Sequence, residues 1–281
     1  MAGTTSTTAS SKALLSPPQV ESLLITPVTS LSVAALVSTL VRTDGTTHRL
    51  PYVRTDPSAA WTLEGAEIAP SNLDVDEVVV TPSKLAGLSI VSSELADDSS
   101  PAAIEAVGLG LARDCARQLD AAFFGNVAAP GPKGLGGLAG VSIVDAGLAF
   151  ENLDAFAEAL SLAEQVGAVV GSFVAAPATV LALSKLKKAT GSNVALLGSD
   201  TESPTGRDIA GVPVYSSQAV EAGVVWSIPR DRSTLVLRKA ATVESDKSVF
   251  FSSDRVAIRA ILRAGFGFAH PAAIVKIAVT P

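Results

Sequence analysis

The positions Gly134, Gly136 and Ala139 follow the spacing of a dinucleotide-binding loop. In such a loop the glycines let the backbone approach a pyrophosphate, and an acidic residue about 20 positions further on binds a ribose hydroxyl. Asp154 lies 20 residues after Gly134. The preceding segment, Ala129–Lys133, contains two prolines where a buried strand is required. We therefore interpret the glycines as part of a connecting loop, with a small-ligand or dinucleotide-binding α/β enzyme as a minor alternative.

Other groups suited to catalysis are few. The chain has two histidines, His48 and His270, one cysteine, Cys115, and no Gly-x-Ser-x-Gly motif. A zinc site of the Cys/His kind uses about four such ligands, and a hydrolase needs a base beside its nucleophile. We interpret both histidines as structural. The sequence thus predicts no enzyme activity, no catalytic or metal-binding residues and no cofactor.

The clearest predicted element is a helix from Pro101 to Gly125. Ser99 or Ser100 can cap its first turn, and proline fits that turn. Apolar side chains recur at steps of three and four residues and form one stripe: Ile104, Val107, Leu111, Cys115, Leu119 and Ala122. We therefore predict that Cys115 is a buried apolar side chain and not a reactive thiol.

The segment Asp44–Ser83 indicates an extended hairpin. Two strand-like runs, Thr46–Arg54 and Leu73–Thr81, flank a connection far longer than an ordinary hairpin loop. Two arginines and seven acidic residues give this segment a net charge of −5, against −6 for the whole chain. Because an isolated two-stranded ribbon is marginally stable in water, we expect another subunit to support it. Near its tip, Trp61 and Glu64 are predicted to contact that neighbour.

A long strand is predicted near the C-terminus. Every second residue from Val256 to Phe268 is apolar and lies on one face of the strand. Arg255, Arg259 and Arg263 lie on the opposite face. Residues 230–276 hold nine basic and four acidic residues, a net charge of +5. We predict that this surface meets the acidic hairpin of another subunit; the alternatives are pairing within one chain or plain solvation. The candidate contact residues are Arg49, Arg54, Trp61, Glu64, Glu67, Asp74, Asp76, Glu77, Arg255, Arg259 and Arg263.

Composition limits the class of protein. The 281 residues are 48% apolar, enough for one large core or two smaller ones. A pI near 5.0 argues against nucleic-acid binding through bulk charge. The uncharged runs Ser22–Val41 and Gln165–Ser184 contain prolines and either many hydroxyl residues or glycines, so we predict no membrane span.

The remaining pattern predicts an arm, a strand and a compact α/β lobe. The arm, residues 12–41, includes a possible short helix near Pro18–Leu24, and a strand is expected over 84–95. The lobe is expected to contain helices 152–166 and 177–190 and strands 168–175, 212–216, 224–228, 233–237 and 241–245. A last strand is expected over 273–279.

Several short motifs occur in an order that resembles a known family. They are Ala60–Gly65 (AWTLEG), Thr81–Ala86 (TPSKLA), Val91–Ser99 (VSSELADDS), Ala210–Val214 (AGVPV), Arg255–Arg259 (RVAIR), and His270–Ala273 (HPAA) with Val275–Lys276. Together they resemble the major capsid protein of tailed bacteriophages, with the Hong Kong 97 type of shell fold. The resemblance covers about residues 14–279.

The resemblance implies an α+β, Hong Kong 97-like fold. Its parts are an N-terminal tail and arm (1–43), an extended β-hairpin loop (44–84), a peripheral domain with a long spine helix (85–149), an axial α/β domain (150–242) and closing strands of the peripheral domain (243–281).

The implied function is that of a structural protein. Copies of the chain form pentamers and hexamers of an icosahedral head, assembled in the cytoplasm of the bacterial host, and the virion encloses double-stranded DNA without sequence-specific binding. A separate scaffolding protein, a portal and a decoration protein are the further partners implied. The alternative is an encapsulin-like nanocompartment shell that encloses an enzyme.

Two departures from the family are expected to matter. Some relatives join subunits through an isopeptide bond from a hairpin lysine, but residues 44–83 contain no lysine, so we expect shells held by burial and charge. Other relatives begin with a long cleavable scaffolding segment. Little sequence precedes the arm here, which favours a separate scaffolding protein or none.

Overall fold

A computed structural model gives the fold and describes residues 13–14, 24–55, 57–65, 67, 70, 72, 74–92, 101–189, 192–197, 205–239, 241–250 and 254–280. The helices are α2 (Thr26–Leu31), α3 (Val33–Val37), α5 (Pro101–Phe124), α6 (Asp154–Gln165) and α7 (Pro177–Lys185). The strands are β1 (Ala13–Leu14), β2 (Thr39–Thr43), β3 (His48–Thr55), β4 (Asp74–Val80), β5 (Ser83–Ser92), β6 (Ser142–Asp145), β7 (Ser172–Ala175), β8 (Asp208–Ile209), β9 (Val212–Ser216), β10 (Val224–Ile228), β11 (Ser233–Arg238), β12 (Thr242–Phe250), β13 (Arg255–Phe268) and β14 (Val275–Ala278).

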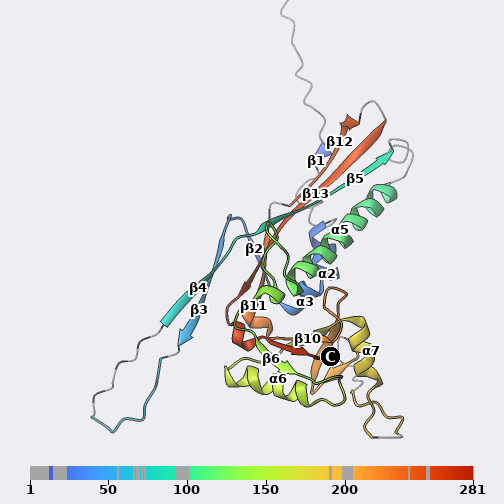
Figure 1. Cartoon of the computed structure of the whole chain (residues 1–281). Helices are drawn as coiled ribbons and strands as arrows, with labels where there is room; N and C mark the ends of the chain where they lie inside the picture. The colour runs from blue at the N-terminus through green and yellow to red at the C-terminus, as the bar shows by residue number, and fades with distance from the viewer. Residues whose placement is uncertain are drawn as a thin grey trace, which may run out of the picture.

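The strand β13 is the centre of an elongated sheet (Figure 1). Among the described residues this sheet has six strands, in the order β1-β12-β13-β11-β2, with β5 also paired to β13. β5 runs antiparallel along one edge of β13, while β12 and then β11 occupy the other edge. One long strand thereby connects the distant end of the sheet to its base.

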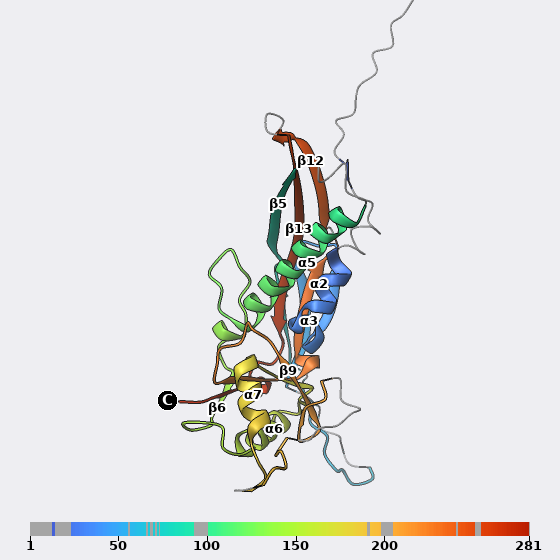
Figure 2. The same cartoon turned by 90° about the vertical axis from the view of Figure 1, so that its right-hand side faces the viewer.

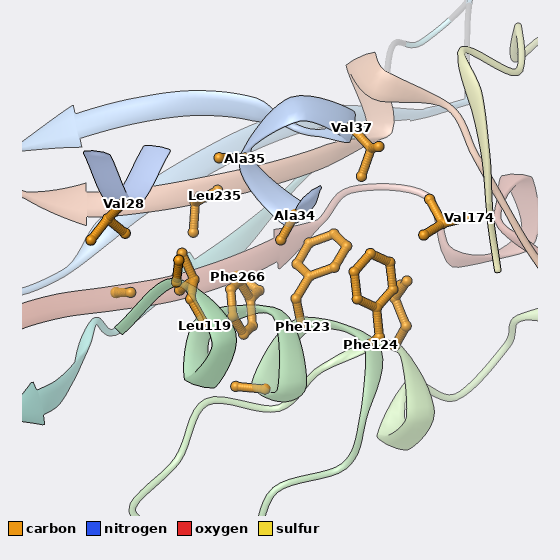
Figure 3. Packing of buried hydrophobic residues seen from close by; sticks show 14 of the residues in the cluster. Val28, Ala34, Ala35, Val37, Leu119, Phe123, Phe124, Val174, Leu235 and Phe266 are labelled. Carbon is orange, nitrogen blue, oxygen red and sulfur yellow. The ribbon is translucent and has the colours of Figure 1, made fainter. Parts of the chain in front are cut away.

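Helices α2, α3 and α5 cover one face of this sheet (Figure 2). From Cys115 onward the predicted apolar stripe of α5 is buried, with Cys115, Leu119 and Ala122 in the core, and Leu111 is half-buried. Phe123 is fully buried, and its ring lies edge-on to those of Phe124 and Phe266, with centroids 5.0 and 5.1 Å away (Figure 3). Such aromatic pairs add about 0.5–1.5 kcal/mol beyond area burial, so the end of α5 is firmly fixed to the sheet.

A buried carboxylate attaches the N-terminal helices to α5. Asp120 accepts a hydrogen bond from the Ser32 hydroxyl at 2.6 Å and from the backbone N–H groups of Val33 at 3.0 Å and Ala34 at 2.9 Å. These donors surround the first turn of α3, whose N-cap is Ser32. Burial raises the pKa of the Asp120 carboxyl, and the three hydrogen bonds oppose that rise.

The second lobe is built on another sheet, in the order β6-β14-β10-β7-β9-β8. Helices α6 and α7 cover one face through buried side chains such as Phe156 and Leu183. The other face contributes Val174 and Trp226 to the core beneath α5. The two lobes therefore share packed side chains and support each other. No helix in the described part of the chain has the length and apolar character to cross a membrane.

The hairpin of β3 and β4 extends to one side of both lobes (Figure 1). Its strands pair antiparallel from His48 and Val80 at the root to Thr55 and Asp74 at the far end. Hydrogen bonds within the ribbon join only these two strands among the described residues. The prediction of two strands flanking a long connection is confirmed.

The two sheets do not follow the domain bounds that the sequence analysis predicts. β14 lies beside β10 in the second sheet, although residues 243–281 were expected to close the peripheral domain. β6 belongs to the same sheet, although residues 85–149 were also expected in the peripheral domain. β11 pairs with β13 although it falls within 150–242. The cause is that alternation along a strand predicts which side chains share a face but not which strand lies next to it.

Several element bounds also differ. α6 and α7 are shorter than expected, and β7 covers only the second half of the strand predicted over 168–175. Helices α2 and α3 were not predicted, and the short helix expected near Pro18–Leu24 falls almost entirely outside the described residues.

We predict that Asp120→Ala destabilises the dissociated subunit by roughly 2–5 kcal/mol, because three buried donors lose their acceptor. The effect should depend on pH. Since the folded-state pKa is raised, the pH-dependent part of the stability that Asp120 contributes is fully present below its ordinary pKa of 3.8 and is lost as the pH rises through the folded pKa, while the hydrogen bonds that the carboxylate accepts keep their contribution. Urea unfolding of both proteins on each side of that pH measures the difference.

The matched control is Asp114→Ala on the same helix. Asp114 is exposed and forms a surface ion pair with Arg117, so its loss should change the free energy of unfolding by less than about 0.5 kcal/mol. Equal stability of the Asp120→Ala variant and the parent would show that this carboxylate does not fix the N-terminal helices.

Candidate intersubunit surfaces

The glycine pattern of the suspected dinucleotide loop has a packing role. A Cβ on Gly134 would lie 2.0 Å from the Ala122 carbonyl oxygen, and one on Gly136 would lie 2.9 Å from the Gly125 carbonyl carbon. The Gly136 N–H donates to the Gly125 carbonyl oxygen at 3.2 Å. The loop thus closes the C-terminal end of α5, where the helix dipole is negative and disfavours a phosphate. The dinucleotide interpretation of these residues is therefore wrong.

The two histidines and Cys115 lie apart from one another in the fold. His48 begins β3, His270 follows β13, and the Cys115 thiol is buried in the core under α5. Burial raises the pKa of the Cys115 thiol, with a smaller contribution from Asp114, which disfavours the reactive thiolate. The described residues contain no cluster of His, Cys, Asp and Glu that could hold a metal ion.

One face of the hairpin exposes three valines, which lie on either side of the central pair Pro51 and Glu77. Directly opposed residues of antiparallel strands share a face; Arg49 therefore lies with Val79, and Val53 lies with Val75. The three valines are 40–53% exposed. A valine row this open to water is unusual in a two-stranded ribbon and favours contact with another surface. We name this row, Val53, Val75 and Val79, the valine face.

The far end of the hairpin is exposed in the same way. Trp61 has 106% and Leu63 has 85% of the reference exposure for its residue type. Glu64 and Glu67 beside them are also exposed. An aromatic side chain without intrachain packing gains most from burial against a partner, which agrees with the expected contact at this site.

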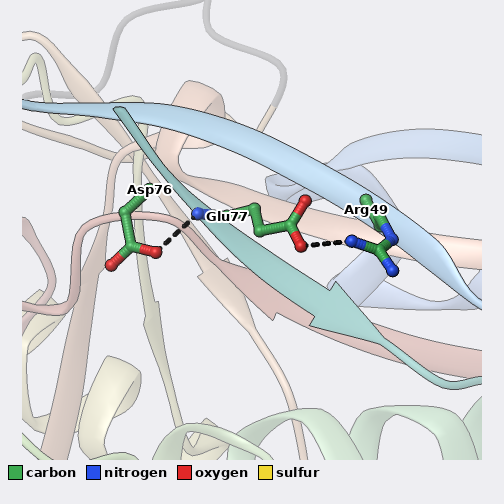
Figure 4. Close-up of polar contacts among 3 residues, drawn as sticks. All are labelled: Arg49, Asp76 and Glu77. Atoms are coloured by element: carbon green, nitrogen blue, oxygen red, sulfur yellow. Dashed lines mark hydrogen bonds and ion pairs between the residues drawn. The ribbon is translucent and has the colours of Figure 1, made fainter. Parts of the chain in front are cut away.

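Ion pairs within the hairpin use part of its charge. Arg49 pairs with Glu77, and the Glu77 backbone N–H donates to the Asp76 carboxylate (Figure 4). Tyr52 also donates to Asp76, at 3.2 Å. Arg49 and Glu77 therefore have partners in their own chain, while Asp74, Asp76 and the acidic tip keep the ribbon negative.

The predicted basic surface forms on the face of the elongated sheet away from the helices. Arg255, Arg259 and Arg263 occupy alternate positions of β13, while the even-numbered apolar residues enter the core. Across the pairing with β5, Leu88 lies opposite Arg259, and Lys84 lies opposite Arg263. We call this surface the outer face; its residues are Lys84, Leu88, Ile90, Glu244, Arg255, Ala257, Arg259, Ile261 and Arg263.

Sequence reasoning missed the apolar part of the outer face. Leu88 is 63% and Ile90 is 44% exposed. Alternation along 84–95 does not mark them, because both faces of β5 carry apolar side chains and the intervening positions are only half-buried. Arg259 also pairs with Glu244 across the sheet, so the alternative of pairing within one chain holds for this residue. The structure places the basic row on one surface, and its contact with a hairpin stays a prediction.

Comparisons with known proteins place this geometry in a family. The sequence profile of the phage capsid family matches residues 13–279. The chain therefore belongs to the phage capsid family, and it is a major capsid protein, a structural protein of the bacteriophage head. No match was found among curated proteins.

Solved structures share the fold. The capsid of a native GTA particle, computed with C5 symmetry, is 20% identical with a TM-score of 0.68, covering 100% of this chain and 96% of that chain. A chain from Mycobacterium phage Bobi is 16% identical with a TM-score of 0.71, covering 89% and 91%. A virus-like particle from Pyrococcus furiosus is 13% identical with a TM-score of 0.65, covering 92% and 98%. The expected α+β, Hong Kong 97-like fold is confirmed, and nothing favours the nanocompartment alternative over the phage capsid.

We predict that the fluorescence of Trp61 reports assembly. The emission should move to shorter wavelength when subunits assemble, because an exposed indole becomes buried, whereas Trp226 is 4% exposed already. A Trp61→Phe variant isolates the Trp226 signal, which should stay constant. Identical emission from shells and dissociated subunits would contradict an interface at the hairpin tip.

Proposed function

We propose that this capsid protein assembles by laying the hairpin of each copy across the outer face of a neighbouring copy. The observation that carries the proposal is the lack of a core in the hairpin, whose valine face and tip are exposed. Two-stranded ribbons of this kind are not stable alone. A neighbour that covers the valine face supplies the burial that the chain itself does not.

The two surfaces are complementary in polarity. The outer face combines exposed Leu88 and Ile90 with a row of basic side chains, and the hairpin combines three valines with acidic residues. Apolar contact supports affinity, and opposite charge supports the choice of partner and register. A heterologous contact of this type, between different patches of identical subunits, closes into rings.

Rings then join into the icosahedral head of a tailed phage. We place the second lobe at the axes of pentamers and hexamers, in line with the C5 symmetry of the similar GTA capsid. Interfaces of obligate assemblies bury about 2,000–5,000 Å², so the stability of the shell exceeds that of the subunit. Assembly takes place in the cytoplasm of the bacterial host.

The remaining partners are proposed from the same role. They are a portal, a separate scaffolding protein and a decoration protein. The enclosed molecule is double-stranded DNA. With a net charge of −6 the chain has no general attraction for phosphates, so enclosure and not affinity retains the DNA.

We predict that Arg259→Glu strongly reduces shell assembly while the subunit stays folded. The substitution opposes the acidic hairpin of a neighbour. Within the subunit it removes one partly exposed ion pair with Glu244 and places two like charges opposite each other, and each of these effects costs about 1 kcal/mol or less. Electron microscopy gives the yield of closed shells, and thermal unfolding gives the stability of the subunit.

The matched control is Arg113→Glu, which makes the same charge change on the exposed surface of α5. It should leave the yield of shells closer to that of the parent. If Arg259→Glu forms shells as well as the parent does, or if both variants fail equally, attraction between the hairpin and the outer face does not guide assembly.

A further inference from the structure

The root of the hairpin crosses β13 at two glycines. Gly265 and Gly267 continue the outer face beyond Arg263 at alternate positions of β13. They carry no side chain, so the backbone of β13 is open on this face. The last residue of β4, Val80, lies against both glycines and is 3% exposed. The hairpin therefore begins at the closest approach of two strands.

This approach requires glycine at both positions. A Cβ on Gly265 would lie 2.7 Å from Cγ1 of Val80 and 3.2 Å from Cα of Pro82. A Cβ on Gly267 would lie 2.8 Å from Cγ2 of Val80 and 2.3 Å from Cδ1 of Leu50. The leucine end can move aside, but valine is stiff at χ1 and the Pro82 backbone is constrained. An added methyl at Gly265 therefore displaces the strand itself.

The contacts of the root described next fix the start of the hairpin, but they do not set the direction of β4 as Gly265 and Gly267 do. Lys239 holds the beginning of the hairpin through an ion pair with Asp44 at 3.0 Å and a backbone bond to Thr43 at 3.0 Å. The end of β4, from Val78 to Val80, borders a cavity of about 290 Å³ that Phe266 and Phe268 also line. Space of that size does not restrain the strand, whereas the contact with the glycines does.

We propose that Val80 seated on Gly265 and Gly267 is the joint that sets the angle at which the hairpin leaves the subunit. β4 has seven residues, so it is roughly 23 Å long, and a tilt of about 10° moves its far end by roughly 4 Å. The tip lies further out and moves more. The joint thereby decides where the hairpin meets a neighbour, and this last step rests on the proposed function.

The joint is tested by a distance between two spin labels. In a Cys115→Ala background, Ala60→Cys near the tip and Glu158→Cys on α6 carry the labels, and labelled chains are diluted with unlabelled ones so that distances within one chain are measured. Gly265→Ala should shift the mean distance by several ångströms. Gly265→Ala combined with Val80→Ala should restore most of it, because the Cγ1 methyl that lies 2.7 Å from the new Cβ is gone and the remaining contact, with Cα of Pro82 at 3.2 Å, needs only a small adjustment. Gly110→Ala, in open space on α5, should leave it unchanged.

An unchanged distance in Gly265→Ala, or a shift that Val80→Ala fails to reverse, would overturn the joint. If Gly265→Ala does not fold, the single variant Val80→Ala is measured instead. It removes the contact with the glycines, so the distribution of label distances should broaden, and an unchanged width would reject the proposal. The shells are then imaged separately. A shifted distance with shells of normal diameter supports the joint and counts against the proposed docking of the hairpin, so the two ideas fail independently.

Discussion

The structure depends on one constraint: a two-stranded hairpin has two faces and cannot bury either of them alone. The root is packed on Gly265 and Gly267, but beyond it the valine face and Trp61 remain exposed. We therefore expect the free energy that orders this part of the chain to come from another molecule. In a family of phage capsid proteins, that molecule is most simply another copy of the chain.

The rest of the subunit is held together by packing and hydrogen bonds within the chain. The long strand β13 runs from the distant end of the elongated sheet to the second lobe, and α5 packs along it through Phe123. Asp120 fixes the N-terminal helices to the same α5 by three hydrogen bonds. The core is therefore stable within one subunit, and only the hairpin is expected to depend on a neighbour. Assembly can then proceed without refolding of the core.

Much of this architecture could be predicted from the sequence, and the failures have a common cause. Periodicity predicted α5 with its buried Cys115 and the row of Arg255, Arg259 and Arg263 on one face of β13, because each depends on local spacing. The pairing of β14 with the second sheet could not be predicted, since alternation does not identify a neighbouring strand. The carboxylate of Asp120 gave no signal because its donors lie 86 to 88 residues away. At the candidate site the charges were predicted, whereas Leu88 and the closely packed glycines depend on the three-dimensional contacts.

Hydrogen exchange measured on dissociated subunits and on assembled shells tests the central claim most directly. Amides of β3 and β4 at the valine face should exchange rapidly in the dissociated subunit and become strongly protected in the shell, while those of α5 and β10 stay protected in both. Peptides from residues 48–55 and 74–80 report the hairpin. Equal protection of these peptides before and after assembly would show that the hairpin is stable without a neighbour and would contradict the account.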